Sequence, residues 1–161
     1  MLAALLVSCS EPSSAPVQTD WDAWPWMTAD IPTSVRLAAR LAPATASSTT
    51  YSVTLTFSNT TGESATASFG ACSFGIRLYA DSTGLGMPAW DNRPPPNTGC
   101  ILPLYVVQLG PHASADRQVG LFDPAIAASV LSHGRYRVVV TWRSSATGAV
   151  ETVPADMISL P

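Results

Sequence analysis

The chain has 161 residues, a net charge of −3 at pH 7 and 12% charged residues, and its eight positive charges are all arginines. This length favours a single domain. The weakly acidic balance argues against a nucleic-acid partner, which requires a basic footprint. No apolar run reaches the ~18 residues of a membrane-spanning helix.

The first residues combine a short apolar run with a cysteine. Leu6-Val7-Ser8-Cys9 resembles the lipobox of bacterial lipoproteins, in which the cysteine becomes the lipidated first residue of the mature protein. The resemblance implies that residues 1–9 are the remnant of a signal peptide and that Cys9 is lipidated. It also implies an exported protein on the bacterial membrane, with Ser10 favouring the outer membrane in a host that has two. The alternative is a frayed apolar terminus with an incidental cysteine, since no positive charge precedes the run.

Residues 10–32 are predicted to be a tether followed by a tryptophan-rich segment. Residues 10–20 are polar, rich in proline and serine, and without periodicity, as in a disordered spacer. Trp21, Trp24 and Trp26 follow closely. Burial of a large aromatic side chain contributes roughly 2–3 kcal/mol, so these rings are expected either to pack on the domain or to form a contact surface for a partner.

Residues 33–161 are expected to form one all-β domain. Apolar and polar residues alternate with a period of two in short segments separated by turn residues, the pattern of half-buried antiparallel strands. The segments cover residues 35–41, 51–57, 65–69, 73–80, 102–106, 113–121, 136–142 and 149–159. Pro103 predicts an edge or a bulge for its strand. Asp123 and Pro124 predict the cap and first position of one or two helical turns.

The strand that begins at Tyr136 has the clearest pattern. Tyr136, Val138, Val140 and Trp142 share one face, and a Leu131-x-x-Gly134-x-Tyr136 turn precedes them. This is the arrangement of a tyrosine corner in immunoglobulin-like sandwiches, in which the phenol bonds to upstream backbone. We therefore predict an immunoglobulin-like antiparallel β-sandwich of about seven or eight strands.

The same elements resemble the intracellular proteinase inhibitor (BsuPI-type) family over about residues 35–145. That family has a Y-x-V-T-L-x-F-x-N-x-T strand and turn, matched with variation by residues 51–61, a strand like Phe74 to Leu78, and a variable loop containing a Trp, here Trp90. Its closing L-x-x-G-x-Y-x-V strand corresponds to Leu131 to Val138. The resemblance implies a β-sandwich and proteinase inhibition, but this chain departs from the family in carrying two internal cysteines and in its export signature.

The long loop at residues 81–100 is a candidate contact surface. Loops of this length in compact domains are usually functional or disordered. Met87 and Trp90 are expected to anchor it to the body of the domain, and a short strand is one form that this anchor can take. The triplet Pro94, Pro95 and Pro96 after Arg93 favours an extended conformation. With Cys9 lipidated, the remaining cysteines form an even pair, which favours a Cys72–Cys100 disulfide in an oxidising compartment; a reduced buried pair is the alternative.

The sequence carries no recognisable catalytic, phosphate-binding or metal-binding motif, and we expect no enzyme, cofactor or metal. We therefore predict a cell-envelope lipoprotein with a non-enzymatic, monomeric binding or structural module, held to the membrane by its lipid alone. Its protein partner is contacted by the 81–100 loop or by Trp21, Trp24 and Trp26. The alternative is a proteinase inhibitor that presents the 81–100 loop to a serine protease.

Overall fold

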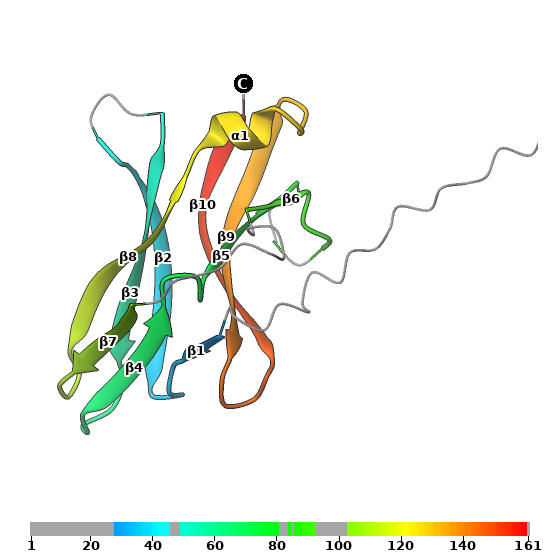
Figure 1. Ribbon diagram of the computed structural model, residues 1–161. Coiled ribbons are helices and arrows are strands. Elements are labelled where there is room, and N and C mark those ends of the chain that lie inside the picture. The colour runs from blue at the N-terminus through cyan, green and yellow to red at the C-terminus, as the bar shows by residue number, and fades with distance from the viewer. Residues whose placement is uncertain (1–27, 46–48, 81–83, 85, 93–102, 161) are drawn as a thin grey trace, which may run out of the picture.

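The computed structural model describes residues 28–45, 49–80, 84, 86–92 and 103–160. This part contains ten strands and one short helix (Figure 1). In chain order they are β1 (Thr28–Asp30), β2 (Val35–Pro43), β3 (Tyr51–Asn59), β4 (Ala65–Gly70), β5 (Gly75–Tyr79), β6 (Trp90–Asp91), β7 (Leu104–Leu109), β8 (Ser114–Phe122), α1 (Pro124–Ala128), β9 (Gly134–Ser144) and β10 (Val150–Leu160).

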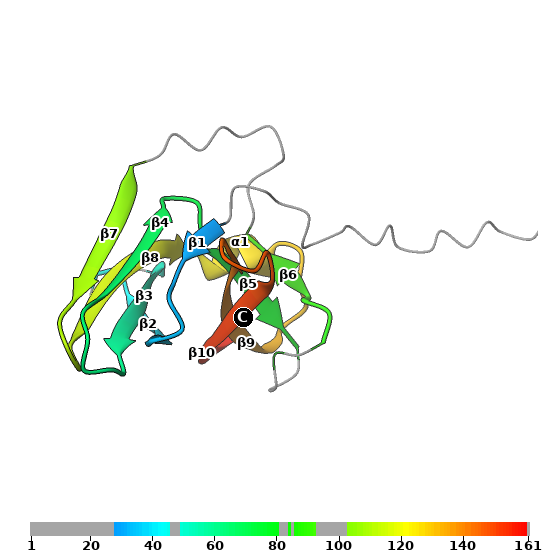
Figure 2. The same ribbon diagram turned by 90° about the horizontal axis from the view of Figure 1, so that it is seen from below.

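The strands form two sheets. The larger is a mixed sheet of seven strands in the order β6-β5-β9-β1-β4-β7, with β10 paired to β9, and the smaller is the antiparallel sheet β2-β3-β8. Figures 1 and 2 show β2, β3 and β8 on one side of the molecule and β5, β9 and β10 on the other. The all-β prediction is confirmed. The division into seven and three strands, with β1 parallel to β9, is not clearly that of an immunoglobulin sandwich.

β9 is the central strand of the larger sheet. It pairs with β10 along most of its length, with β5 in its middle and with β1 near its end. Its predicted core face, from Tyr136 to Trp142, is buried, as the period of two predicts.

The opposite face of β9, which carries Arg135, Arg137 and Arg143, is not a uniformly solvated row of arginines. Val139 and Thr141 on that face are also buried. Gly84 packs against it so closely that an added Cβ would lie 2.9 Å from Val139 Cγ2, and its φ of +69° favours glycine. Arg137 donates through Nη1 to the carbonyl of Ala155 at 2.8 Å. Gly84, which is distant in sequence, therefore covers the middle of this face.

Aromatic side chains join the two sheets. Phe57 of β3 stacks on Phe69 of β4 with ring centroids 5.6 Å apart, and Phe69 also contacts Phe74 and Tyr105. Phe74 in turn meets Trp142 at 5.9 Å. These offset and edge-to-face contacts form one continuous aromatic cluster from β7 to the end of β9.

The predicted elements recur in the structure with small shifts in their bounds. Pro103 directly precedes the edge strand β7, and Asp123 caps α1 by accepting a hydrogen bond from the Ala125 amide at 2.9 Å. Thr28–Asp30, which the sequence assigned to the tether and tryptophan-rich segment of residues 10–32, form β1 between β4 and β9. The folded region therefore includes residues before position 33.

Candidate functional site

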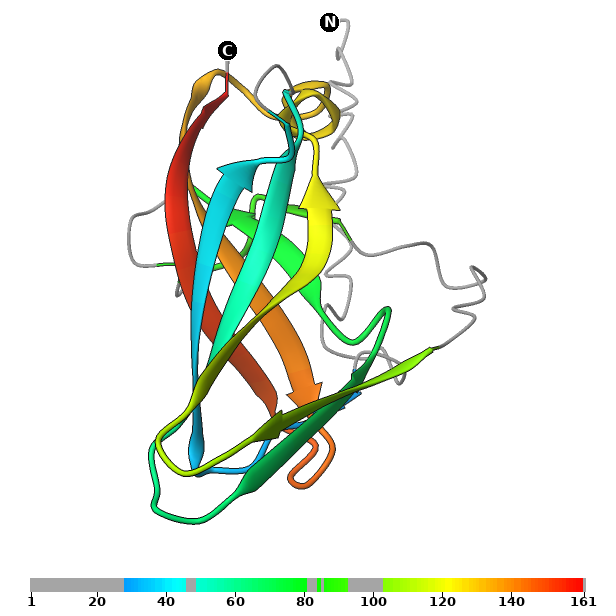
Figure 3. The ribbon, with the colours of Figure 1, turned by 90° about the vertical axis from the view of Figure 1, so that its left-hand side faces the viewer.

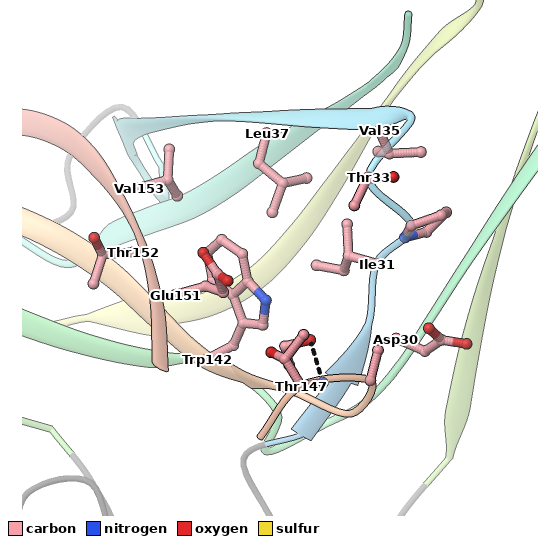
Figure 4. Close-up of a pocket in the computed structure, with 13 residues that line it drawn as sticks. Asp30, Ile31, Thr33, Val35, Leu37, Trp142, Thr147, Glu151, Thr152 and Val153 are labelled. Carbon is pink, nitrogen blue, oxygen red and sulfur yellow. Dashed lines mark hydrogen bonds between the residues drawn. The ribbon is translucent and has the colours of Figure 1, made fainter. Parts of the chain in front are cut away.

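A groove of about 360 Å³ lies at one end of the molecule, between the β1–β2 connection and the β9–β10 hairpin. Its apolar lining comes from Ile31, Val35, Leu37, Trp142 and Val153. Figure 4 shows Leu37, Ile31 and Trp142 around the groove, each from a different part of the chain. In Figure 1 this end carries β1 and the β9–β10 turn, and α1 lies at the opposite end.

Register places an acidic side chain beside the buried indole. Glu151 of β10 lies directly opposite Trp142 of β9, and Val153 lies opposite Val140 two positions further along. Directly opposed residues project from the same face of a sheet. Glu151 therefore continues the core-facing row of β10 to the open end of the sandwich, where its side chain is exposed while Trp142 and Val153 are buried.

The charged residues that line the groove are Asp30 and Glu151. Both are exposed, and neither carboxylate forms an ion pair or side-chain hydrogen bond within the part of the chain that the structure describes. The remaining polar lining consists of hydroxyls, including Thr33, Thr152 and Ser144, whose Oγ accepts from the Thr147 amide at 3.4 Å. The groove thus combines an apolar floor with two uncompensated negative charges.

A second cavity, of about 380 Å³, lies beside Trp90 and α1. Its apolar lining includes Leu121, Phe122 and Ile126. Its two carboxylates already have internal partners, because Asp91 pairs with Arg77 and Asp123 caps α1. The two carboxylates of this cavity are therefore already used in contacts within the fold, unlike those of the first groove.

In the described part of the 81–100 loop, the two predicted anchors, Trp90 and Met87, have different surroundings. Trp90 forms β6 with Asp91, pairs with β5, and meets Phe122 edge-on at 5.6 Å. Asp91 accepts from Arg77 Nε at 3.0 Å, and Asn92 bonds Ile76 through both its amide and its side chain. Met87 is 67% exposed. The short strand at Trp90 is therefore present, but Met87 does not anchor the loop to the body.

The predicted tyrosine corner has its expected hydrogen bond. Tyr136 is buried and donates through its hydroxyl to the carbonyl of Ser132 at 3.0 Å, and Leu131 packs against the core from the same turn. Gly134 lies beside the ring, where an added Cβ would meet Tyr136 Cε2 at 3.5 Å, an ordinary contact. This turn is structural and lies at the other end of β9 from the groove, since Tyr136 pairs with Ile158 of β10 whereas Trp142 pairs with Glu151.

Several sequence-predicted residues lie outside the described residues. They are Cys9, Trp21, Trp24, Trp26, Arg93, Pro94, Pro95, Pro96 and Cys100. Cys72 is half-buried in the turn between β4 and β5 and is not a free thiol. Because Cys100 is not described, its pairing with Cys72 stays a prediction.

Sequence reasoning missed Asp30 and Glu151, which lie more than a hundred positions apart and belong to no motif. One feature of the sequence could have indicated Glu151. The final strand carries an acid at the position that its alternation with Val153 and Ala155 assigns to the buried face.

Comparisons with protein-family models and with curated proteins found no match for this chain. The resemblance to the BsuPI-type family therefore depends on the sequence motifs alone. Within the described ranges, no helix is long and apolar enough to cross a membrane. The same ranges hold no group of three or more His, Cys, Asp or Glu side chains placed to bind a metal ion.

Proposed function

We propose that this chain is a cell-envelope lipoprotein whose β-sandwich is a non-enzymatic binding module, and that the groove at Trp142 is its binding surface. The observation that carries the proposal is the pair of unpaired carboxylates, Asp30 and Glu151, beside an apolar floor. A volume of about 360 Å³ is within the usual range of ligand sites, in which apolar lining supplies affinity and a few polar groups fix orientation.

The partner that this chemistry favours is a protein segment with alternating apolar and basic side chains. An apolar side chain would occupy the space between Leu37 and Trp142, and an arginine or lysine would pair with Glu151 or Asp30 at the rim. A cation near the indole gains a further electrostatic attraction to the ring. The net charge of −3 favours the approach of a cationic segment.

Calorimetric titration of the full chain with a short peptide of alternating leucine and arginine tests this function. We expect saturable binding, weakened about threefold to fivefold by Glu151→Gln, the loss typical of one exposed charge pair. Glu63→Gln, which removes an exposed acid from the β3–β4 turn, is the matched control and should leave the affinity unchanged. Equal affinity for a leucine–glutamate peptide would contradict the proposal.

Membrane attachment through Cys9 is the second part of the proposal. The lipobox-like residues and the polar spacer after them support it. Expression of the full chain in a bacterium fed radiolabelled palmitate should give a labelled, membrane-associated protein, and Cys9→Ser should abolish both properties. Incorporation of label into the Cys9→Ser variant would exclude this attachment.

Proteinase inhibition is the second candidate function. The observation that favours it is the anchoring of Ala89 to Asn92 on β5, which holds one end of the loop in place and so reduces the entropy lost on docking. A Cys72–Cys100 disulfide would hold the other end. Titration of subtilisin- and trypsin-type proteases with the full chain should give stoichiometric inhibition that Arg93→Ala weakens. Unchanged protease activity at molar excess would exclude this candidate.

A further inference from the structure

The edge strands of the described sheets differ in how they are protected from pairing with another chain. Native edges usually carry charges, proline, bulges or very short strands, because an unpaired row of N–H and C=O groups is a template for another strand. β6 has two residues. β8 carries Asp116 and Arg117 and has a register shift opposite Val53 and Thr54.

β2 is an edge strand of the smaller sheet, and β10 lies along it. A side chain of β10 prevents β2 from pairing with another strand there. The β10 register shifts between Pro154 and Met157, and Asp156 in this bulge accepts the Leu41 amide of β2 at 2.8 Å. The carboxylate thus occupies a backbone donor of β2 that would otherwise be open, and the bulge bends the strand. Each of these edges has a device against strand addition.

The six residues of β7 carry no such device, since Pro103 lies before the strand rather than within it. β7 is the terminal strand of the larger sheet, and its six residues, LYVVQL, contain no charge and no proline. Leu104 is 68% exposed and Val106 is 49% exposed. Figures 2 and 3 show β7 beyond β4 at the boundary of the sheet, with no described strand on its outer side.

We propose that β7 is a homodimer interface, at which the outer edges of two copies pair antiparallel about a two-fold axis. Pairing with β4 uses the backbone groups of alternate residues of β7, so the other residues direct their N–H and C=O groups outward. A two-fold operation matches these groups to the same groups of a second copy, because each strand supplies both donors and acceptors.

A second copy fits this edge better than a charged partner, because an uncharged strand meets its own copy without repulsion. Leu104 and Val106 share one face of β7, so antiparallel pairing brings these side chains from both copies together and covers apolar surface that each monomer exposes. The groove at Trp142 has no residue in β7, so the dimer and the proposed binding function are independent.

Analytical ultracentrifugation of the full chain over a range of concentrations tests the dimer. We expect a monomer–dimer equilibrium that Val106→Lys shifts to monomer, because each copy would bring a positive charge to the apolar face that the pairing covers. Val130→Lys is the matched control, since Val130 is 69% exposed outside β7, and it should dimerise like the original chain. Circular dichroism establishes that each variant is folded.

Hydrogen exchange provides a second measurement that does not depend on a substitution. Outward-facing amides of β7 should become more protected as the protein concentration rises, while those of β8 should not. A chain that remains monomeric at its highest soluble concentration would overturn the proposal. The proposal would also be overturned if the Val106→Lys variant still formed a dimer and the amides of β7 showed no increase in protection with concentration.

Discussion

At the scale of single residues, Asn59 shows how one buried polar side chain can hold two turns. It is 3% exposed, and its Nδ2 donates to the carbonyls of Glu63 at 2.6 Å and Gly110 at 2.9 Å. Its Oδ1 accepts from the amide and the hydroxyl of Thr61. The β3–β4 and β7–β8 turns are therefore fixed to each other by a side chain whose donors and acceptor are all used.

Asn59→Asp should destabilise the fold at neutral pH by about 1–3 kcal/mol, because an oxygen would replace the donor and leave two carbonyls facing it. Chemical denaturation measures the effect. Thr60→Ala, which removes an exposed hydrogen bond to Ser34, is the neighbouring control and should cost less. Equal losses in the two variants would show that the Asn59 network contributes nothing beyond one surface bond.

Asp116 on β8 is an exposed carboxylate whose pKa lies below its ordinary value. The main cause is the Thr56 hydroxyl, which donates to Oδ1 at 2.6 Å, and the Arg40 guanidinium at 2.6 Å from Oδ2 acts in the same direction. Desolvation opposes these effects but is smaller than the first. A carboxyl whose pKa is lowered by folding stabilises the folded state above its unfolded pKa.

The stability that Asp116 contributes should therefore be lost as the pH falls through its folded pKa. Asp116→Asn should lower the melting temperature at pH 7, and the difference from the original chain should disappear at an acidic pH below that folded pKa, where both side chains are neutral. Thermal unfolding at the two pH values measures this. A constant difference at both would mean that ionisation of Asp116 does not contribute.

At the scale of elements, the two-residue strand β6 is held against β5 by a buried ion pair rather than by a long row of backbone hydrogen bonds. Arg77 and Asp91 lie directly opposite each other, and their side chains are 8% and 1% exposed. Removing one partner of a buried ion pair is usually strongly destabilising, whereas replacing both partners with apolar residues is often neutral. The pair thus selects the position of the 89–92 segment on β5.

Asp91→Leu should cost about 3–5 kcal/mol of unfolding free energy, and addition of Arg77→Met should recover a large part of that loss. A double-mutant cycle by denaturant unfolding gives the coupling energy. Additive losses would indicate that each side chain acts through other contacts.

The elements also show which features could be predicted from sequence. The nine-residue β3 and the eleven-residue β9 repeat their alternation often enough to be recognised. β1 and β6 have three and two residues, too few for a period, and exist because longer strands bind them. The bulge in β10 and the covering of Val139 by Gly84 depend on contacts across the fold, which no local pattern contains.

At the scale of the whole molecule, the groove at Trp142 and the edge strand β7 both pack against one aromatic cluster of the core. Trp142 at the groove and Tyr105 on β7 lie at the two ends of the aromatic cluster that includes Phe69 and Phe74. The groove itself could not be predicted from sequence, because Asp30 and Glu151 line one groove only when β1 pairs beside the end of β9. The fold class could be predicted from the period of two in the sequence. The groove depends on how the strands are ordered in the sheets, which that period does not contain.

The measurement that tests the binding proposal most directly is a two-dimensional NMR titration of the full, isotope-labelled chain with the leucine–arginine peptide. The account predicts shifts of the Trp142 indole N–H and of amides in residues 30–37 and 142–153, with β7 and the second cavity unaffected. Saturable shifts confined to Trp90 and α1, or none at Trp142, would contradict the assignment of the groove as the binding surface.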